Sequence, residues 1–543
     1  MVSNLPVVYV RGYAGGDRGI EKAVEDPFYG FNEGSVHVRV GVSGRPSFYQ
    51  FESPLLRLMI DGGRPEGGAP HQGYQLLVHG SQERYLAEAE PGSVPQASIW
   101  VHRFYDVSAE SLTTQAATLS GDENSPLRHR EFDLESAAVS LLELITNVKR
   151  ATGAPRVHLV AHSMGGLICR CLIQKVLPDR GEHGLDHIDR LFTYGTPHGG
   201  IHFDIGGGLF ERIRDAVDIN GASIFGPERM YAYLTPEAGR ADRVPDGWVA
   251  NRIPPELFPG DRVFCLVGTN PADYDVAFGL SSKAVGPKSD GLVQIESAYL
   301  KGANFAFVHR SHSGRYGLVN SEEGYQNLRR FLFGDLSVSA DLVNYTLPGE
   351  PDAGMTWQAD VRLSVRGMPI VMHEQVAAHQ CPVQLEWSGD QDSAGKPTPL
   401  VTTFLSSGES RPGTATMRYL LQFRILSLRE RGGIFSFGDH LEQSADFDDM
   451  LVVDIEPARP GESPRGWAAW ASEIKEPLRD YAPSDAQLMT DEEPAEGAWL
   501  AHIELPQRSA AFLGPDARIQ LTVTPTETDP STSATRGGSG FRD

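Results

Sequence analysis

The hydrophobic period of the sequence changes near Gly334, and this change constrains the fold more than any other feature. Before Gly334, short apolar segments alternate with amphipathic helical patterns, whereas after it apolar and polar residues alternate one by one. Apolar strands separated by helices predict an α/β domain with a mostly parallel sheet covered on both faces. Alternation predicts an antiparallel β-sandwich. We expect the α/β domain over 1–334, the β-sandwich over 335–524 and a polar, disordered tail over 525–543.

The expected elements follow from the same periodicities. Asp133 and Gly153 suit the start and stop of one helix, and a second helix is expected from about Gly165 to Leu177, ended by Pro178. The expected strands of the α/β domain are Pro6–Val10, Ser98–Phe104, Val157–Ala161, Ile188–Tyr194, Arg262–Val267 and Asn304–Val308. Those of the β-domain centre on Trp357–Val365, Val383–Trp387, Tyr419–Ile425, Trp499–Leu505 and Ile519–Val523.

Charge and cysteine content narrow the classes of function. Lys and Arg number 48 against 71 Asp and Glu, a net charge of −23, which argues against a nucleic-acid ligand. The four cysteines have no regular spacing, so we expect them to be reduced. No apolar run reaches about 18 residues and no leader pattern opens the chain, so we expect no membrane span. The expected location is the cytoplasm, or outside the cell by a route without a cleaved leader.

The segment LVAHSMGGL, from Leu159 to Leu167, is the most informative part of the sequence. It places Ser163 between an apolar strand and a helix, with the small residues Ala161 and Gly165 two positions away on either side. Such a tight turn lifts a serine clear of the sheet at a helix N-terminus, where the helix dipole favours a developing oxyanion. The alternative is a serine that merely caps the helix.

The first expected strand runs into a glycine-rich turn, VVYVRGYAGG. Such a turn can direct a backbone N–H at an oxyanion, so we expect the N–H groups of Tyr13 and Met164 to form an oxyanion hole. A simple glycine turn explains this segment equally well when it is taken alone.

Two further segments complete a constellation for nucleophilic catalysis. SDGLV carries Asp290, and His312 lies 22 residues further along the chain. The order Ser163, Asp290, His312 is the nucleophile, acid and base order of an α/β-hydrolase. A third segment, FTYGTPHGG, follows the strand next to that of Ser163.

Together, AHSMGG, GTPHGG, SDGLV and the glycine-rich first turn resemble the bacterial lipase and lipase-like branch of the α/β-hydrolase superfamily. The resemblance covers about Pro6 to Gly334 and departs from the family pattern at Ala161 and Arg11, which stand where glycine and histidine are usual. It implies hydrolysis of carboxylic esters of lipids through an acyl-enzyme, with Ser163 as nucleophile, His312 as base and Asp290 as its partner. Such chemistry needs no cofactor or metal, and a lipid or other acyl ester would be the partner, with peripheral contact to a membrane surface.

Several alternatives stay open for individual residues. His309 competes with His312 for the role of base, and Asp273 or Asp275 could replace Asp290. His162 adjoins the nucleophile but should leave the turn in another direction. His198 in GTPHGG is expected to be a structural turn residue.

The two long insertions, about 17–97 and 200–261, do not identify the substrate. The second presents an apolar stripe at helical steps after a glycine run, which fits either a lid over an acyl site or a packed surface helix. Its apolar residues are Leu209, Phe210, Ile213 and Val217. A thioesterase, a short-chain esterase, and a binding or effector protein whose β-domain recognises a partner are the other functions we consider.

Overall fold

The structure is a computed structural model that describes most of the 543 residues. By their contacts, the described residues form two units. The first extends to Asn304 and includes Arg310–Tyr325, whereas the second comprises Phe305–His309 and the chain from Gln326 onward. The described residues are 4–12, 35–40, 46–51, 54–61, 73–76, 82–102, 133–201, 225–273, 286–314, 317–334, 336–349, 355–366, 368, 370–387, 397–405, 416–429, 445–456, 465–492 and 499–526.

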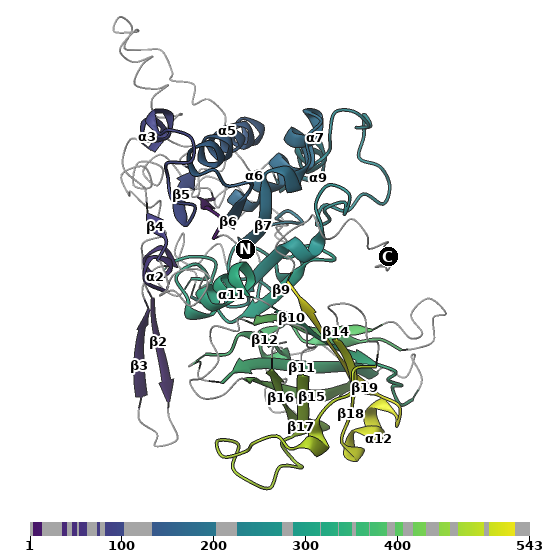
Figure 1. The fold of residues 1–543 in the computed structure, drawn as a ribbon. Helices are drawn as coiled ribbons and strands as arrows, with labels where there is room; N and C mark the ends of the chain where they lie inside the picture. Colours follow the sequence, from purple (N-terminus) through teal and green to yellow (C-terminus); the bar gives the residue numbers. More distant parts are fainter. Residues whose placement is uncertain are drawn as a thin grey trace, which may run out of the picture. The chain divides into compact units, whose positions relative to one another are not determined.

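A seven-stranded sheet with the order β4-β5-β1-β6-β7-β8-β9 organises the first part of the chain (Figure 1). From β4 to β8 all neighbouring strands pair in parallel. Every residue of β1, β5, β7 and β8 is buried, which is typical of parallel strands covered on both faces. The strands are β1 (Val7–Val10), β4 (Gln75–Leu76), β5 (Ser98–His102), β6 (Val157–His162), β7 (Ile188–Tyr194), β8 (Val263–Gly268) and β9 (Asn304–Val308).

This arrangement confirms the expected α/β-hydrolase fold class. α6 packs against β1 and β6, and α5 packs against α6 and α3. The first insertion contributes a separate antiparallel hairpin of β2 (Ser35–Val40) and β3 (Pro46–Phe51). The helices of this part are α2 (Pro54–Asp61), α3 (Gln82–Glu88), α5 (Leu134–Thr152), α6 (Met164–Cys171), α7 (Leu177–Asp179), α9 (Pro227–Leu234) and α11 (Glu322–Phe333).

Of the two predicted helices, the first begins and ends at the expected residues, whereas the second extends past its expected end. Asp133 accepts the N–H of Ser136 at 3.0 Å and Gly153 ends α5 at φ 68°, as predicted. The expected end of the second helix at Pro178 is wrong, because the helix continues to Asp179. The N–H of Leu177 bonds to the carbonyl of Leu172, five residues back, in a π-helical turn. That turn already interrupts the regular ladder beside Pro178, which has no N–H to contribute.

Two antiparallel sheets form the β-domain, as expected for a sandwich (Figure 1). One has the order β14-β10-β19-β18 and the other β12-β11-β15-β16-β17, with β13 paired to β11. The short helix α12 (Ala510–Leu513) precedes the last strand. The strands are β10 (Leu336–Val343), β11 (Met355–Val365), β12 (His373–Gln375), β13 (Val383–Leu385), β14 (Thr398–Leu405), β15 (Met417–Arg429), β16 (Phe447–Glu456), β17 (Arg465–Trp470), β18 (Trp499–Glu504) and β19 (Arg518–Pro525).

The alternating residues of these strands build one continuous core. Trp357, Val361, Leu421, Phe423 and Ile519 are all buried in it. The intervening residues point away from the core, as the period of two requires. The alternation read from the sequence therefore marks the packed face of the β-domain correctly.

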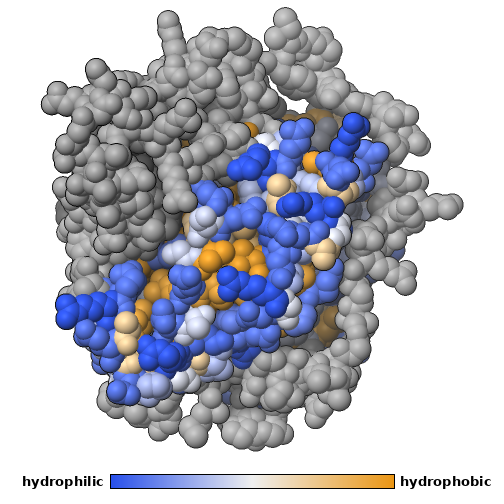
Figure 2. Space-filling view, turned by 90° about the horizontal axis from the view of Figure 1, so that it is seen from above, coloured by the Kyte–Doolittle hydropathy of each residue, from blue (hydrophilic) through white to orange (hydrophobic). Residues whose placement is uncertain are grey.

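The described surface is mainly hydrophilic on the face shown in Figure 2, with hydrophobic residues gathered near its centre. Within the described ranges, no helix combines the length and the apolar character that crossing a membrane requires. All four cysteines are buried, and none forms a disulfide.

Buried histidines make the folded state sensitive to acid. Burial lowers the pKa of His102 to about 3, and those of His158 and His373 to about 4. An unfolded chain would protonate these rings near pH 6.5, before the folded chain does. Proton uptake by the unfolded state therefore lowers the free energy of unfolding as the pH falls below about 6.5. Asp341, whose pKa burial raises to about 6, acts in the opposite direction.

We predict that the free energy of unfolding falls between pH 7 and pH 5 by up to about 1.4 kcal/mol per pH unit for each such histidine, and that the urea midpoint falls with it. His373→Gln should flatten this dependence for the β-domain, because one of its depressed groups is removed. Urea titrations followed by tryptophan fluorescence at several pH values measure the effect. A slope that is the same in His373→Gln and in the natural chain would contradict the assignment.

Candidate active site

Ser163 occupies a strained turn between β6 and α6. Its φ of 54° and ψ of −130° lie outside the regions that residues with a side chain usually adopt. Its N–H donates to the carbonyl of Tyr194, at the end of the neighbouring strand β7, at 2.9 Å. The turn thus has the backbone of a nucleophile elbow, which presents the serine hydroxyl above the carboxyl end of the sheet.

Glycines allow the surrounding chain to approach this turn. A Cβ at Gly12 would lie 2.6 Å from Cβ of Ser163 and 2.9 Å from the nitrogen of Met164. A Cβ at Gly165 would overlap the carbonyl oxygen of Val10. Gly12, at the start of the turn after β1, therefore lies directly against the elbow.

Three side chains from separate segments meet at this edge of the sheet. Nε2 of His312 lies 2.9 Å from Oγ of Ser163, and Nδ1 of His312 lies 2.8 Å from Oδ2 of Asp290. His312 and Asp290 are both buried. The structure thus brings together the three residues named from the sequence in the order hydroxyl, imidazole and carboxylate.

Backbone hydrogen bonds fix the carboxylate and the imidazole relative to each other. Oδ1 of Asp290 accepts the N–H groups of Leu292 at 3.0 Å and Val293 at 2.8 Å. The N–H of His312 donates to the carbonyl of Asp290 at 2.9 Å. One Asp290 oxygen is therefore held by its own turn, while the other is left for His312.

Two of the rival residues named from the sequence have other partners. His309 is exposed, and its ring stacks on that of His379 with 3.7 Å between centroids. Asp273 accepts a hydrogen bond from the side chain of Asn270 at 2.7 Å. Asp275 lies outside the described residues.

His162 and His198 both serve as neighbours of the site. Nε2 of His162 lies 3.0 Å from the carbonyl of His312 and must donate to it, since a carbonyl only accepts. Burial and the nearby His312 ring lower the pKa of His162 to about 3, so the ring is neutral. His198 is buried in its turn, with Nε2 3.1 Å from Oγ1 of Thr193. Its carbonyl accepts from the buried guanidinium of Arg170 at 2.9 Å.

The expected oxyanion hole is described only in part. Met164 is the first residue of α6, so its N–H lies at the positive end of that helix. Tyr13 lies outside the described residues. So do Leu209, Phe210, Ile213 and Val217 of the expected lid helix.

Sequence reasoning missed the role of the turn after β7. Gly195 has φ 51°, and a Cβ there would lie 2.9 Å from Oδ2 of Asp290 and 3.1 Å from Nδ1 of His312. A Cβ at Gly268, at the end of β8, would lie 2.7 Å from Cβ of Asp290. The GTPHGG segment stands out in the sequence, but only the fold shows that its first glycine makes room for Asp290 and His312.

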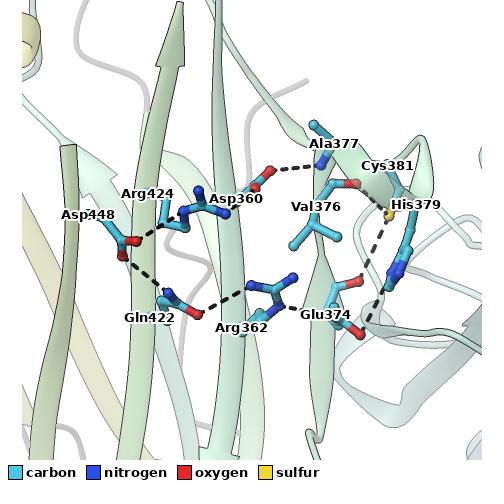
Figure 3. Close-up of polar contacts among 10 residues, drawn as sticks. All are labelled: Asp360, Arg362, Glu374, Val376, Ala377, His379, Cys381, Gln422, Arg424 and Asp448. Carbon is cyan, nitrogen blue, oxygen red and sulfur yellow. Dashed lines mark hydrogen bonds and ion pairs between the residues drawn. The ribbon is translucent and has the colours of Figure 1, made fainter. Parts of the chain in front are cut away.

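The β-domain carries a polar cluster of its own, drawn in Figure 3. Arg362 pairs with Glu374 at 2.6 Å, and Arg424 lies 3.5 Å from Asp360 and 3.2 Å from Asp448. These two guanidinium groups and three carboxylates compensate one another across β12, β11, β15 and β16. Among the described residues, no group of three or more His, Cys, Asp or Glu is arranged to hold a metal ion.

No protein-family model matches the chain. Similar solved structures include a Bacillus licheniformis lipase in its mature form, with 16% identity over 35% of this chain and 71% of that one and a TM-score of 0.26. A gene product of Listeria innocua has 13% identity over 61% and 94% of the two chains, with a TM-score of 0.25. A candidate cell surface hydrolase of Lactobacillus plantarum has 12% identity over 61% and 90%, with a TM-score of 0.23.

We predict that Gly195→Ala lowers ester turnover by about a hundredfold, because the new methyl group would displace His312 from Asp290 and Ser163. Gly181→Ala is the matched control. Its φ of 73° imposes the same backbone penalty, but a Cβ there meets nothing within 4 Å. Steady-state kinetics of the two variants measures the difference. Equal turnover in both would show that crowding at the acid and base is unimportant.

Proposed function

We propose that this chain is a serine hydrolase that cleaves carboxylic esters of lipids through an acyl-enzyme. The observation that carries the proposal is the continuous contact from Ser163 Oγ through the His312 ring to Asp290, set on a strained elbow. A serine that merely capped a helix would need neither the positive φ nor the buried imidazole. The site lies at the carboxyl ends of parallel strands, where α/β sheets place their ligands.

Acylation would begin with the Ser163 hydroxyl. Nε2 of His312 takes its proton while Oγ attacks the ester carbonyl carbon, and the carbonyl oxygen becomes an oxyanion. The carbon–oxygen bond to the leaving alcohol then breaks. His312 returns the proton to that alcohol, and the acyl group stays on Ser163.

Deacylation would repeat these steps with water. His312 accepts a proton from the water as its oxygen attacks the acyl carbonyl, and then protonates Ser163 Oγ as the acid departs. Asp290 keeps Nδ1 of His312 protonated and stabilises the imidazolium form in both halves. The N–H of Met164, at the start of α6, is one proposed donor toward the oxyanion, and the N–H of Tyr13 is the other.

Lipid esters are the proposed substrate class because of the lipase-like sequence motifs and the apolar insertions. A thioesterase or a short-chain esterase would use the same three residues, so the leaving group and chain length distinguish them. We do not favour a binding or effector protein built on the β-domain. In the described residues, the arginines and carboxylates of the cluster in Figure 3 pair with one another, so they are no evidence for a charged partner.

We predict that Ser163→Ala lowers ester turnover at least about a thousandfold without unfolding the chain. His312→Gln should have a similar effect, because no base then faces the hydroxyl. His309→Gln is the matched control and should leave turnover near that of the natural chain, since its ring stacks on His379. Turnover of p-nitrophenyl esters and labelling by a fluorophosphonate probe measure these effects.

Two results would contradict this assignment. Full hydrolysis by pure Ser163→Ala would remove the mechanism, whereas loss of activity in His309→Gln with activity retained in His312→Gln would reassign the base. Thermal unfolding of each variant separates loss of chemistry from loss of fold.

We predict that activity on p-nitrophenyl esters peaks at an acyl chain of about eight carbons or longer. Each buried CH₂ contributes about 0.8 kcal/mol, so an apolar acyl site should raise kcat/KM several-fold per carbon until it is filled. A series from acetate to palmitate measures the profile, with the matching thioesters run in parallel. A maximum at acetate or butyrate would exclude the long-chain specificity and leave the catalytic residues unaffected.

A further inference from the structure

The backbone of Ser163 is bound on both sides by one short segment, Tyr194–Gly195–Thr196. The N–H of Ser163 donates to the carbonyl of Tyr194 at 2.9 Å, and Oγ1 of Thr196 donates to the carbonyl of Ser163 at 2.8 Å. Thr196 is fully buried. The turn after β7 therefore forms hydrogen bonds with both the N–H and the carbonyl of Ser163.

The carbonyl of Ser163 belongs to the same peptide group as the N–H of Met164. A peptide group is planar and trans, so its C=O and N–H point in opposite directions. A donor that fixes the direction of the Ser163 oxygen therefore also fixes the direction of the Met164 N–H. That N–H is one of the two donors that we propose for the oxyanion hole.

We infer that the Thr196 hydroxyl is a positioning group that aims the Met164 N–H at the oxyanion. The inference rests on the proposed function, because it assigns a part of the same site. The N–H of Gly166 also reaches the Ser163 oxygen, at 3.0 Å, but it lies in the first turn of the same helix and moves with it. Thr196 lies outside α6, in the turn after β7, and can hold the peptide against the sheet.

The close approach of Gly166 is consistent with this role. A Cβ at Gly166 would overlap Oγ1 of Thr196 and would lie 2.6 Å from its Cγ2. The second glycine of SMGG thus lets α6 come near enough for the Thr196 hydroxyl to reach Ser163. The same turn holds Gly195 against Asp290 and His312, so one three-residue segment touches all members of the proposed catalytic group.

The test replaces the hydroxyl while keeping the shape of the side chain. Thr196→Val should lower kcat by about tenfold or more, which is less than the hundredfold to thousandfold cost of losing a whole oxyanion donor. KM should change little, because the donor acts on the transition state. The affinity for an alkyl trifluoromethyl ketone, which forms an oxyanion when Ser163 adds to it, should fall by the same factor as kcat/KM.

Two variants serve as controls. Thr196→Ser keeps the hydroxyl and should restore activity to within about threefold of the natural chain. Thr152→Val removes another buried threonine hydroxyl, which donates to the carbonyl of Val148 in α5, and should alter the melting temperature without altering kcat.

A kcat for Thr196→Val equal to that of the natural chain would overturn the inference. An equal loss in Thr196→Val and Thr196→Ser would also overturn it.

A crystal structure of Thr196→Val gives an answer that does not depend on activity. The peptide between Ser163 and Met164 should rotate, turning the Met164 N–H away from its present direction. An unrotated peptide would overturn the inference. If the natural chain neither hydrolysed esters nor reacted with a fluorophosphonate at Ser163, the proposed function would fail, whereas the orientation of this peptide would still decide the role of Thr196.

Discussion

Ser163 is held at a φ of 54° by hydrogen bonds from its N–H to Tyr194 and from Thr196 to its carbonyl. A strained backbone of this kind costs of order 1–3 kcal/mol and persists only where the surrounding structure over-determines it. Here the constraint comes from the parallel pairing of β6 and β7, whose last paired residues are His162 and Tyr194. Strand register thus determines the position of Ser163, and the contacts of His312 and Asp290 are built around that point.

The second constraint is the limited space around Ser163, Asp290 and His312. Glycines at the ends of β7 and β8 lie where any side chain would meet Asp290 or His312, and two more lie against the elbow. Each removes a Cβ at a place where two backbones or a backbone and a functional side chain must come within van der Waals contact. Gly195 and Gly268 make room for Asp290 and His312, whereas Gly12 and Gly165 make room for the turn at Ser163. The precision of the site therefore depends on close packing as much as on its three functional side chains.

Several charged residues of the β-domain pair with one another within the domain. Arg418 makes a buried ion pair with Asp454 at 2.9 Å, and its guanidinium lies 4.9 Å from the ring of Tyr481. Removing either partner of such a pair leaves an uncompensated buried charge, which is strongly destabilising. The acidic composition of this part of the chain consequently includes many structural carboxylates and is no simple measure of a binding surface. Asp449 is another example, since it accepts from both Ser472 and Arg508.

The sequence by itself determined the elements whose residues carry a periodic signal. Apolar runs marked β7 and β9 to the residue, and alternation marked the buried faces of β11, β15, β18 and β19. β16 went unseen because its aspartates interrupt the apolar pattern, and only their partners in space make them compatible with a strand. Local patterns report which face a residue occupies, but they carry no information about partners supplied by distant segments.

Motifs in the sequence narrowed the functional residues to a serine and a few candidate acids and bases. Tertiary structure places His312 at Ser163 and stacks His309 on His379. Thr196 lies in the GTPHGG segment, but nothing in that segment indicates the hydrogen bond from its hydroxyl to a residue 33 positions earlier in the chain. Type and spacing suggest which chemistry a chain carries, whereas the pairing of parallel strands decides which side chains meet, because it brings together residues that are far apart in sequence.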